Sequence, residues 1–357
     1  ADVFSRSEAR ANELEGLELD GFTAIPDEPL SFHPQYMLVR EYGLDQWGKL
    51  FNARQQVSMV TFARLAHEAH TKMLELGLSQ DFAKAIATYL GLGVDRLADR
   101  CSTLCRWDSS PKMEAITNTF ARQALPMVWD YAEGVPFSEA SGGFQTCLNW
   151  ILLFLETECF STEATPTVKM ADARNRDGMN SIVVTDPPYY DAINYADLSD
   201  YFYVWLKRSI GFLHPDILGL PVTPKRQQIV LNVYATDTSE AEAGEHRRLR
   251  AQRHYVDGMR QAFGAMGGSL TSDGVVGVVF AHSNSDAWAT LIEGLLQAEL
   301  VPDTSWPIDT ELQNKTSAAS RANLQTSVWM ACRPRNQINR DAFLEDVIAE
   351  MRPVIRE

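Results

Sequence analysis

One stretch decides the fold of this chain: Ser181-Ile182-Val183-Val184-Thr185-Asp186-Pro187-Pro188-Tyr189. Its β-branched half predicts a strand, and Asp-Pro-Pro predicts a rigid turn at the strand's end, because proline presets φ and aspartate favours turns. Residues 275–282 form a second β-branched run, typical of a strand buried on both faces. A helical pattern over 287–300 and strand patterns over 302–308 and 327–332 follow. This order predicts an α/β domain whose parallel sheet is closed by a terminal hairpin.

The Asp-Pro-Pro-Tyr turn carries groups suited to a planar base with an exocyclic amine. The Asp186 carboxylate and the Pro187 carbonyl can each accept one amine hydrogen, since proline keeps its acceptor while losing its donor. Tyr189 offers a flat ring for stacking on an extruded base. With both hydrogens held, the nitrogen lone pair is directed toward a methyl donor. The alternative is a rigid turn that only ends a buried strand.

The residues after the turn predict a helix from Ala196 onward, with Lys207 and Arg208 suited to its C-terminal end. Tyr190, Asn194 and Tyr195 lie in the connection before that helix. Rigid scaffolds commonly present working residues in such connections. These three are therefore candidates for the rim of a base pocket.

Two further polar residues stand at predicted strand ends. Residues 167–174 predict a strand ending in Asp172, which would reach the adenine ring of a nucleotide-like cofactor, because ligands lie beyond the carboxyl ends of parallel strands. A solvated turn aspartate is the alternative. His282 is expected to be a strand-end residue rather than a catalyst.

With these residues in view, the chain resembles the amino-group DNA methyltransferases, and more closely the large adenine-specific DNA methylases that carry a zinc ribbon. The likeness runs from about residue 47 to residue 335. It is carried by residues 95–99, 104–107, 119–130, 136–138, 185–208 and 306–312.

This resemblance implies a class I (Rossmann-like) methyltransferase sheet and S-adenosylmethionine as cofactor. The implied reaction is methyl transfer to the exocyclic amine of adenine in DNA, in a setting of restriction or phage defence. Asp186, Pro187, Pro188 and Tyr189 map onto the family's catalytic tetrad, and Asp172 and Asp186 become the expected cofactor contacts. Methylation of RNA bases or of protein amides is an alternative within the same chemistry.

The chain departs from the family in its cofactor loop. The glycine-rich loop expected ahead of the tetrad is absent, and Ser141-Gly142-Gly143-Phe144 stands between helical stretches rather than after a strand. The ribbon's paired cysteines are missing too. We therefore expect an incomplete sheet, from a truncated chain or one member of a split pair, with an N-terminal half or partner subunit supplying the loop. A non-catalytic subunit is the alternative of another class.

Composition limits the remaining classes. A length of 357 residues allows two structural lobes, and a net charge of −15 argues against a freestanding nucleic-acid binder. The five cysteines follow no metal spacing, so no metal site is expected; Cys101 and Cys105, four apart, would share one face of a helix. The longest apolar stretch, Ile151 to Leu155, is far too short for a membrane span, and a cytoplasmic protein is expected.

Basic residues offer a route to DNA despite the acidic balance. Arg247, Arg248, Arg250 and Arg253 form a compact run, for which we expect contact with the DNA backbone; a solvated helix face is the alternative. Four other arginines have helical surroundings and are expected to pair with Asp95, Asp99 or Asp130, or to contact phosphate. These four are Arg96, Arg100, Arg106 and Arg122.

The expected domain organisation has four parts. Residues 1–46 predict a linker or peripheral segment, residues 47–165 a helical lobe, and residues 166–335 the catalytic domain with a target-recognition-like insert at 214–265. Residues 336–357 predict a C-terminal helix.

Overall fold

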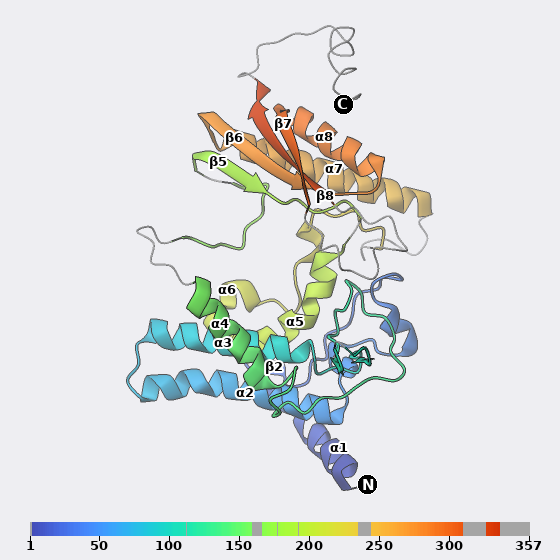
Figure 1. Cartoon of the computed structure of the whole chain (residues 1–357), viewed down its shortest axis with the longest axis vertical. Helices are drawn as coiled ribbons and strands as arrows, with labels where there is room; N and C mark the ends of the chain where they lie inside the picture. The colour runs from blue at the N-terminus through green and yellow to red at the C-terminus, as the bar shows by residue number, and fades with distance from the viewer. Residues whose placement is uncertain are drawn as a thin grey trace. The chain divides into compact units, whose positions relative to one another are not determined.

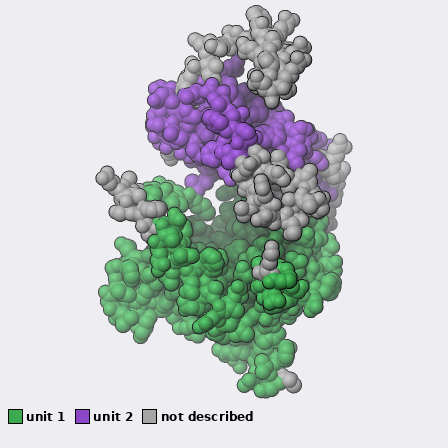
Figure 2. All heavy atoms as spheres, in the orientation of Figure 1, with its two compact units in different colours: residues 1–170, 194–228, 234–237 green, residues 171–193, 229–233, 238–357 purple. Residues whose placement is uncertain are grey.

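The structure is a computed structural model that describes residues 2–111, 113–158, 166–176, 178–191, 193–234, 244–309 and 326–335. The chain divides into two compact units (Figures 1 and 2). Unit 1 comprises residues 1–170, 194–228 and 234–237, and unit 2 comprises residues 171–193, 229–233 and 238–357. The division differs from the ranges that the sequence predicts, because residues 194–228 group with the helical unit. The helix expected over 336–357 lies outside the described residues.

Unit 1 is mainly helical, as the sequence predicts for its central part. Its helices and short strands are α1 (Asp2–Leu14), β1 (Glu18–Leu19), β2 (Phe22–Thr23), η1 (Leu38–Tyr42), η2 (Trp47–Leu50), α2 (Ala53–Glu75), α3 (Gln80–Ala98), β3 (Trp107–Asp108), β4 (Ala115–Ile116), α4 (Phe144–Glu158), α5 (Tyr195–Ile210), η3 (Gly211–Leu213), α6 (Pro215–Leu218) and η4 (Lys225–Gln227).

Side-chain caps begin the long helices α2 and α3, and a glycine in α3 permits its close packing against α5. A capping box between Asn52 and Gln55 begins α2, and the Ser79 side chain caps α3. In α3, a Cβ at Gly91 would lie 2.9 Å from the Ile210 side chain of α5. The absence of a side chain at Gly91 therefore permits α3 and α5 to pack closely.

Two sequence expectations for unit 1 are wrong. Of the two alternatives for residues 1–46, a linker is wrong, since Ala24, Leu30 and Val39 are 0 %, 2 % and 0 % exposed and belong to the core, whereas a peripheral segment stays a prediction. The helix predicted to carry Arg100 and Arg106 ends at Ala98, and the described residues between 99 and 143 form turns and two very short strands. Tertiary packing, not periodicity, organises these segments.

The C-terminal end of α5 is buried rather than solvated. Lys207 and Arg208 are both 0 % exposed, and both form ion pairs with the Glu28 carboxylate. Lys207 also donates to the Pro221 carbonyl at 2.5 Å, and burial lowers the pKa of its ammonium group. Two cations thus share one buried carboxylate, which fastens α5 to the N-terminal segment.

Unit 2 is an α/β unit built on a mixed four-stranded sheet (Figure 1). Its strands are β5 (Asn180–Thr185), β6 (Leu270–Phe280), β7 (Leu300–Asp309) and β8 (Thr326–Pro334), in the spatial order β5-β6-β8-β7. β5 runs parallel to β6, whereas β8 pairs antiparallel with both β6 and β7. The predicted parallel pair with a terminal hairpin is confirmed.

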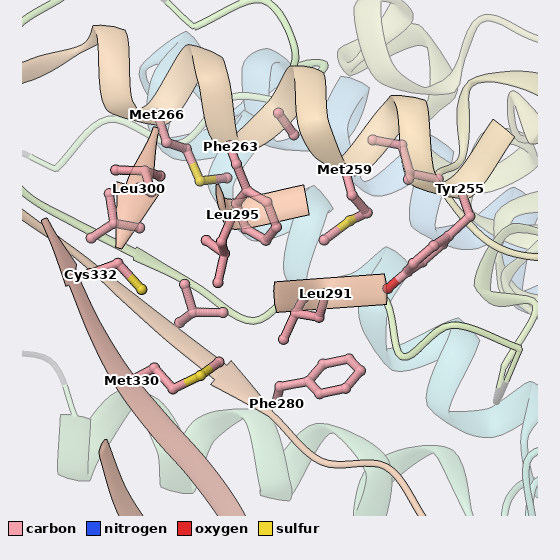
Figure 3. Packing of buried hydrophobic residues seen from close by; sticks show 14 of the residues in the cluster. Tyr255, Met259, Phe263, Met266, Phe280, Leu291, Leu295, Leu300, Met330 and Cys332 are labelled. Atoms are coloured by element: carbon pink, nitrogen blue, oxygen red, sulfur yellow. The ribbon is translucent and has the colours of Figure 1, made fainter. Parts of the chain in front are cut away.

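One face of this sheet is covered by α7 (Gly244–Gly268) and α8 (Ser285–Gln297). Alternate residues of β6, ending in Val276, Val278 and Phe280, are 0 % exposed and point into this layer. Figure 3 shows the packed side chains: Tyr255, Met259, Phe263 and Met266 from α7, Leu291 and Leu295 from α8, and Phe280, Leu300, Met330 and Cys332 from the strands.

The opposite face of the sheet is open in the part of unit 2 that the structure describes. Ile182 and Val184 alternate with the buried Val183 and are 70 % and 59 % exposed. On the same face, Trp306 and Ile308 of β7 are 51 % and 42 % exposed. An apolar sheet face of this kind normally marks an interaction surface.

Candidate functional site

The candidate site is the Asp-Pro-Pro-Tyr turn, which directly follows β5. Because β5 and β6 are parallel, their carboxyl ends lie at one edge of the sheet, with Thr185 paired to Val278. This is the edge where α/β sheets bind ligands. The sequence placed the turn there correctly.

Three hydrogen bonds hold the turn in shape. The Tyr255 hydroxyl of α7 donates to the Pro188 carbonyl at 2.9 Å, and the Tyr190 backbone N–H donates to the same oxygen at 2.9 Å. The Leu231 N–H donates to the Tyr190 carbonyl at 3.1 Å. Tyr190 adopts a left-handed conformation with φ of 53°, which is uncommon for a bulky residue and needs such support.

The two proposed acceptors remain open. Asp186 is exposed and Pro187 is buried. Neither the Asp186 carboxylate nor the Pro187 carbonyl takes part in a hydrogen bond with the described residues. Tyr189 is half-buried and packs edge-on against Phe280, with ring centroids 5.3 Å apart. The turn thus has an exposed carboxylate and the carbonyl of a buried proline, neither hydrogen-bonded within the described residues, beside a half-buried ring.

Tyr190 does not form a pocket rim, contrary to the sequence prediction. It is 3 % exposed and belongs to the core of unit 2, where its ring meets the Tyr255 ring edge-on at 5.1 Å. Burial raises the pKa of its phenol, and a hydrogen bond with Thr290 acts in the opposite direction. Tyr190 therefore supports the turn from within the core of unit 2.

Asn194 and Tyr195 belong to unit 1, not to the unit that carries the turn. Asn194 precedes α5, is 2 % exposed, and its Nδ2 atom has no hydrogen-bond partner in the structure. Tyr195 is 42 % exposed at the first turn of α5. The two stay predictions as substrate contacts.

A histidine–aspartate pair lies at the same sheet edge as the turn. The His282 Nε2 atom is 3.4 Å from the Asp191 carboxylate, and His282 Nδ1 accepts a hydrogen bond from the Asn284 N–H at 3.0 Å. Since Nδ1 accepts, the neutral ring carries its proton on Nε2, facing Asp191. The sequence places His282 correctly at the strand's end, but it does not show the pairing, which arises from the parallel strands.

The strand predicted over residues 167–174 is absent. These residues have no regular secondary structure, and Asp172 forms an ion pair with Arg174, whose Nη2 atom lies 2.6 Å from the Asp172 carboxylate. The Arg174 guanidinium, the strongest influence on it, lowers the pKa of the Asp172 carboxyl. Asp172 is thus engaged locally and is not held at a strand end for a cofactor.

Arg247, Arg248, Arg250 and Arg253 form a basic stripe in the N-terminal part of α7. Arg248, Arg250 and Arg253 are exposed, and Arg247 is half-buried with its Nε atom lacking a hydrogen-bond partner. The Arg248 guanidinium is near enough to act on the Tyr190 phenol and to lower its pKa, against the larger effect of burial. One helix therefore carries both the Tyr255 support of the turn and a row of cations.

No family model, curated protein or solved structure matches this chain.

The glycine pair in unit 1 is structural. Gly142 has φ of 94°, and a Cβ at Gly143 would lie 1.8 Å from the Ser138 carbonyl oxygen, so both glycines are required by a tight turn ahead of α4. They follow loop residues and not a strand. The residues present do not provide the strand-to-helix glycine turn that holds a dinucleotide-like cofactor.

The cysteines of unit 1 that the structure describes are buried. Cys101 and Cys105 lie in a turn beyond α3, not on a helix face, and burial raises the pKa of the Cys101 thiol to about 12. Cys159 lies outside the described residues. Among the residues described, no three His, Cys, Asp or Glu side chains gather closely enough to bind a metal ion.

Within the described residues, the predicted ion pairs of Arg96, Arg100, Arg106 and Arg122 with Asp95, Asp99 or Asp130 are absent. Asp95 is buried, its Oδ1 atom lacks a hydrogen-bond partner, and burial raises the pKa of its carboxyl well above the usual value. Arg96 instead lies over the Trp150 ring, and Arg100 donates to the Ile116 carbonyl.

No described helix has the length and apolarity required to cross a bilayer.

Proposed function

We propose that unit 2 is the acceptor-binding half of an S-adenosylmethionine-dependent methyltransferase that acts on the exocyclic amine of adenine in DNA. The observation that carries the proposal is the pair of open acceptors, the Asp186 carboxylate and the Pro187 carbonyl, in a turn that Tyr255 holds at a strand's carboxyl end. Two acceptors match the two hydrogens of an amine.

In this proposal the chain binds and orients the amine. Asp186 accepts one hydrogen, the Pro187 carbonyl accepts the other, and the Tyr189 ring stacks on the extruded base. With both hydrogens held, the amine lone pair faces the methyl group that the cofactor supplies. Rate acceleration would come from positioning and from exclusion of water rather than from a strong base.

The sheet topology supports a class I (Rossmann-like) methyltransferase assignment. A parallel pair followed by an antiparallel hairpin inserted next to β6 gives the order β5-β6-β8-β7, which fits the closing half of such a sheet. In the described residues β5 pairs with β6 alone, so its other edge is free to accept a strand.

The open face and edge support a partner that completes the sheet. The exposed Ile182 and Val184 lie on that edge strand, and the chain lacks the glycine-rich loop. We therefore place the cofactor loop on an N-terminal half or partner subunit whose strands add at β5. The described residues of this chain do not by themselves form a site for the cofactor.

The basic stripe of α7 supports DNA as the substrate. The chain carries a net charge of −15, so attraction to phosphate must come from a local group of cations. Arg248, which lies within electrostatic reach of Tyr190, connects this stripe to the turn.

Labelled methyl donor tests the proposal. The chain, alone and co-expressed with any polypeptide encoded upstream of residue 1, is offered tritiated S-adenosylmethionine with unmethylated DNA, RNA or protein. We expect label on adenine N6 of DNA, lost in Asp186→Ala and retained in Asp273→Ala, an exposed carboxylate of the same unit. Normal adenine methylation by Asp186→Ala would overturn the assignment, and label in RNA or protein alone would favour those substrates.

A second candidate is a non-catalytic subunit of a split methylase, favoured by the missing glycine loop. Calorimetric titration of the isolated chain with S-adenosylmethionine separates the two candidates. Micromolar binding by the chain alone would remove the main support for the non-catalytic role.

A further inference from the structure

Unit 1 contains a cavity of about 280 Å³ in the segment that connects α3 to α4. Leu104, Met127 and Val128 form an apolar wall, and Arg106, Asn118 and Arg122 supply polar groups. The volume is near the lower end of the roughly 300–1,000 Å³ that small-molecule sites span. The cavity therefore suits a ligand about the size of one nucleotide.

The side chains of the two arginines of the cavity, Arg106 and Arg122, have no hydrogen-bonding or ion-pairing partner among the described residues. Both arginines are exposed. The pKa of the Asp108 carboxyl is lowered chiefly by its hydrogen bonds with Ser110 and least by the Arg106 charge, and Asp108 accepts a hydrogen bond from the Ser110 N–H at 2.9 Å. Two uncommitted guanidinium groups at one cavity form a site for a phosphate.

Exposed aromatic rings adjoin this segment. Trp107 follows Arg106 and is 58 % exposed, and Trp129 follows Val128 and is 75 % exposed. The Trp129 ring is perpendicular to the Tyr42 ring, with the ring centroids 5.2 Å apart, and most of the Trp129 side chain remains exposed. Cations that track phosphate, combined with open aromatic faces, are the usual equipment for binding single-stranded nucleic acid.

We propose that this cavity is a binding subsite for one nucleotide of a single DNA strand. Arg106 and Arg122 hold the phosphate, the wall of Leu104, Met127 and Val128 packs against the sugar, and Trp107 or Trp129 stacks on a base. The subsite belongs to unit 1 and needs neither the methyl donor nor the Asp186 turn. It gives an acidic chain a second local attraction for DNA, independent of α7.

Binding of fluorescein-labelled oligothymidylate to the whole chain, followed by anisotropy at several salt concentrations, tests the subsite. Thymine lacks an exocyclic amine, so it cannot supply the two hydrogens that Asp186 and the Pro187 carbonyl accept in the proposed turn. We expect the Arg106→Ala/Arg122→Ala double variant to bind at least about tenfold more weakly, with a salt slope shallower by about 1.4, or roughly 0.7 for each single-strand phosphate that is no longer neutralised.

Three controls define the outcome. Arg64→Ala removes one exposed arginine of α2, paired there with Glu68, and should bind normally. Urea midpoints of all variants should match, because the cavity arginines form no hydrogen bonds or ion pairs within the described residues. Trp129→Leu should reduce the quenching of protein fluorescence that the oligonucleotide causes.

Unchanged affinity and salt slope in the double variant would overturn the proposal. Competition by inorganic phosphate or AMP, with oligonucleotide binding unchanged in the double variant, would assign the cavity to a free anion and also overturn strand binding. Methylation by Asp186→Ala and oligothymidylate binding by the arginine double variant are separate measurements, so the failure of one proposal is distinguishable from the failure of the other.

Discussion

The Tyr255 hydroxyl of α7 donates a hydrogen bond at 2.9 Å to the carbonyl of Pro188, a residue 67 positions earlier in the chain. This bond, together with the Tyr190 N–H, occupies the Pro188 oxygen and leaves the Pro187 oxygen as the open acceptor of the turn. The helix that packs on the sheet therefore also determines which proline carbonyl of the turn is already occupied by a hydrogen bond.

Tyr255→Phe removes this bond while preserving the ring that packs on Tyr190. We expect a loss of about 1 kcal/mol in the free energy of unfolding, the usual value of one hydrogen bond, and a larger proportional fall in kcat than in 1/KM, because the turn loses its fixed shape. Urea denaturation and steady-state methylation measure the two effects. Tyr42→Phe, at a 52 % exposed residue, is the control, and an equal effect of both changes would contradict the role of Tyr255.

Glu28→Gln leaves Lys207 and Arg208 buried without their carboxylate. Breaking a buried ion pair from one side costs about 3–5 kcal/mol, whereas Glu133→Gln, at the more exposed pair with Arg54, should cost about 1 kcal/mol or less. Chemical denaturation of both variants measures the difference. Equal losses would show that the Glu28 cluster is not desolvated.

Asp95 should make the stability depend on pH. Its folded pKa is raised by burial above the usual 3.8, so the folded state holds the proton more tightly than the unfolded state. Stability therefore falls as pH rises from 3.8 toward the folded pKa, by up to about 1.4 kcal/mol per pH unit. Unfolding curves of the native chain and of Asp95→Asn across this window test the sign, and we expect the slope to become shallower in the variant.

Alanine substitutions at two neighbouring residues of β5 should lower the free energy of unfolding by very different amounts. Val183 is 3 % exposed and Ile182 is 70 % exposed, so Val183→Ala should lose roughly 1–3 kcal/mol and Ile182→Ala less than about 0.5 kcal/mol. Urea denaturation of the isolated chain gives both values. A comparable loss from Ile182→Ala would mean that this face is already covered in the chain by itself.

The basic stripe of α7 is expected to bind DNA by neutralising backbone phosphates. Replacing Arg248, Arg250 and Arg253 by alanine should weaken duplex DNA binding and make its salt slope shallower by about 0.9 for each phosphate that the helix no longer neutralises. Arg260→Ala, an exposed arginine further along the same helix, is the matched control. Binding titrations at several salt concentrations provide the slopes, and equal slopes in all variants would favour a solvated helix face.

Local patterns predicted much of unit 2. The β-branched runs, the helix before β7 and the closing hairpin all lie where the sequence placed them, because strand and helix periods are properties of short segments. The position of the Asp186 turn follows for the same reason, since two adjacent prolines lack the N–H groups that would continue the strand ladder. In unit 1 the periodic stretches became α2 and α3, while residues without a period, such as those around Arg106, were misassigned to a helix.

By itself the sequence determined the type and order of these elements and the acceptor chemistry at the end of β5. The tertiary structure alone decided that Tyr190 supports the turn from the core, that Glu28 neutralises cations 180 residues away, and that Ile182 stays exposed while Val183 is buried. The reason is physical: periodicity and turn chemistry act over a few residues, but burial and pairing depend on which distant segments come together, and that is settled by packing.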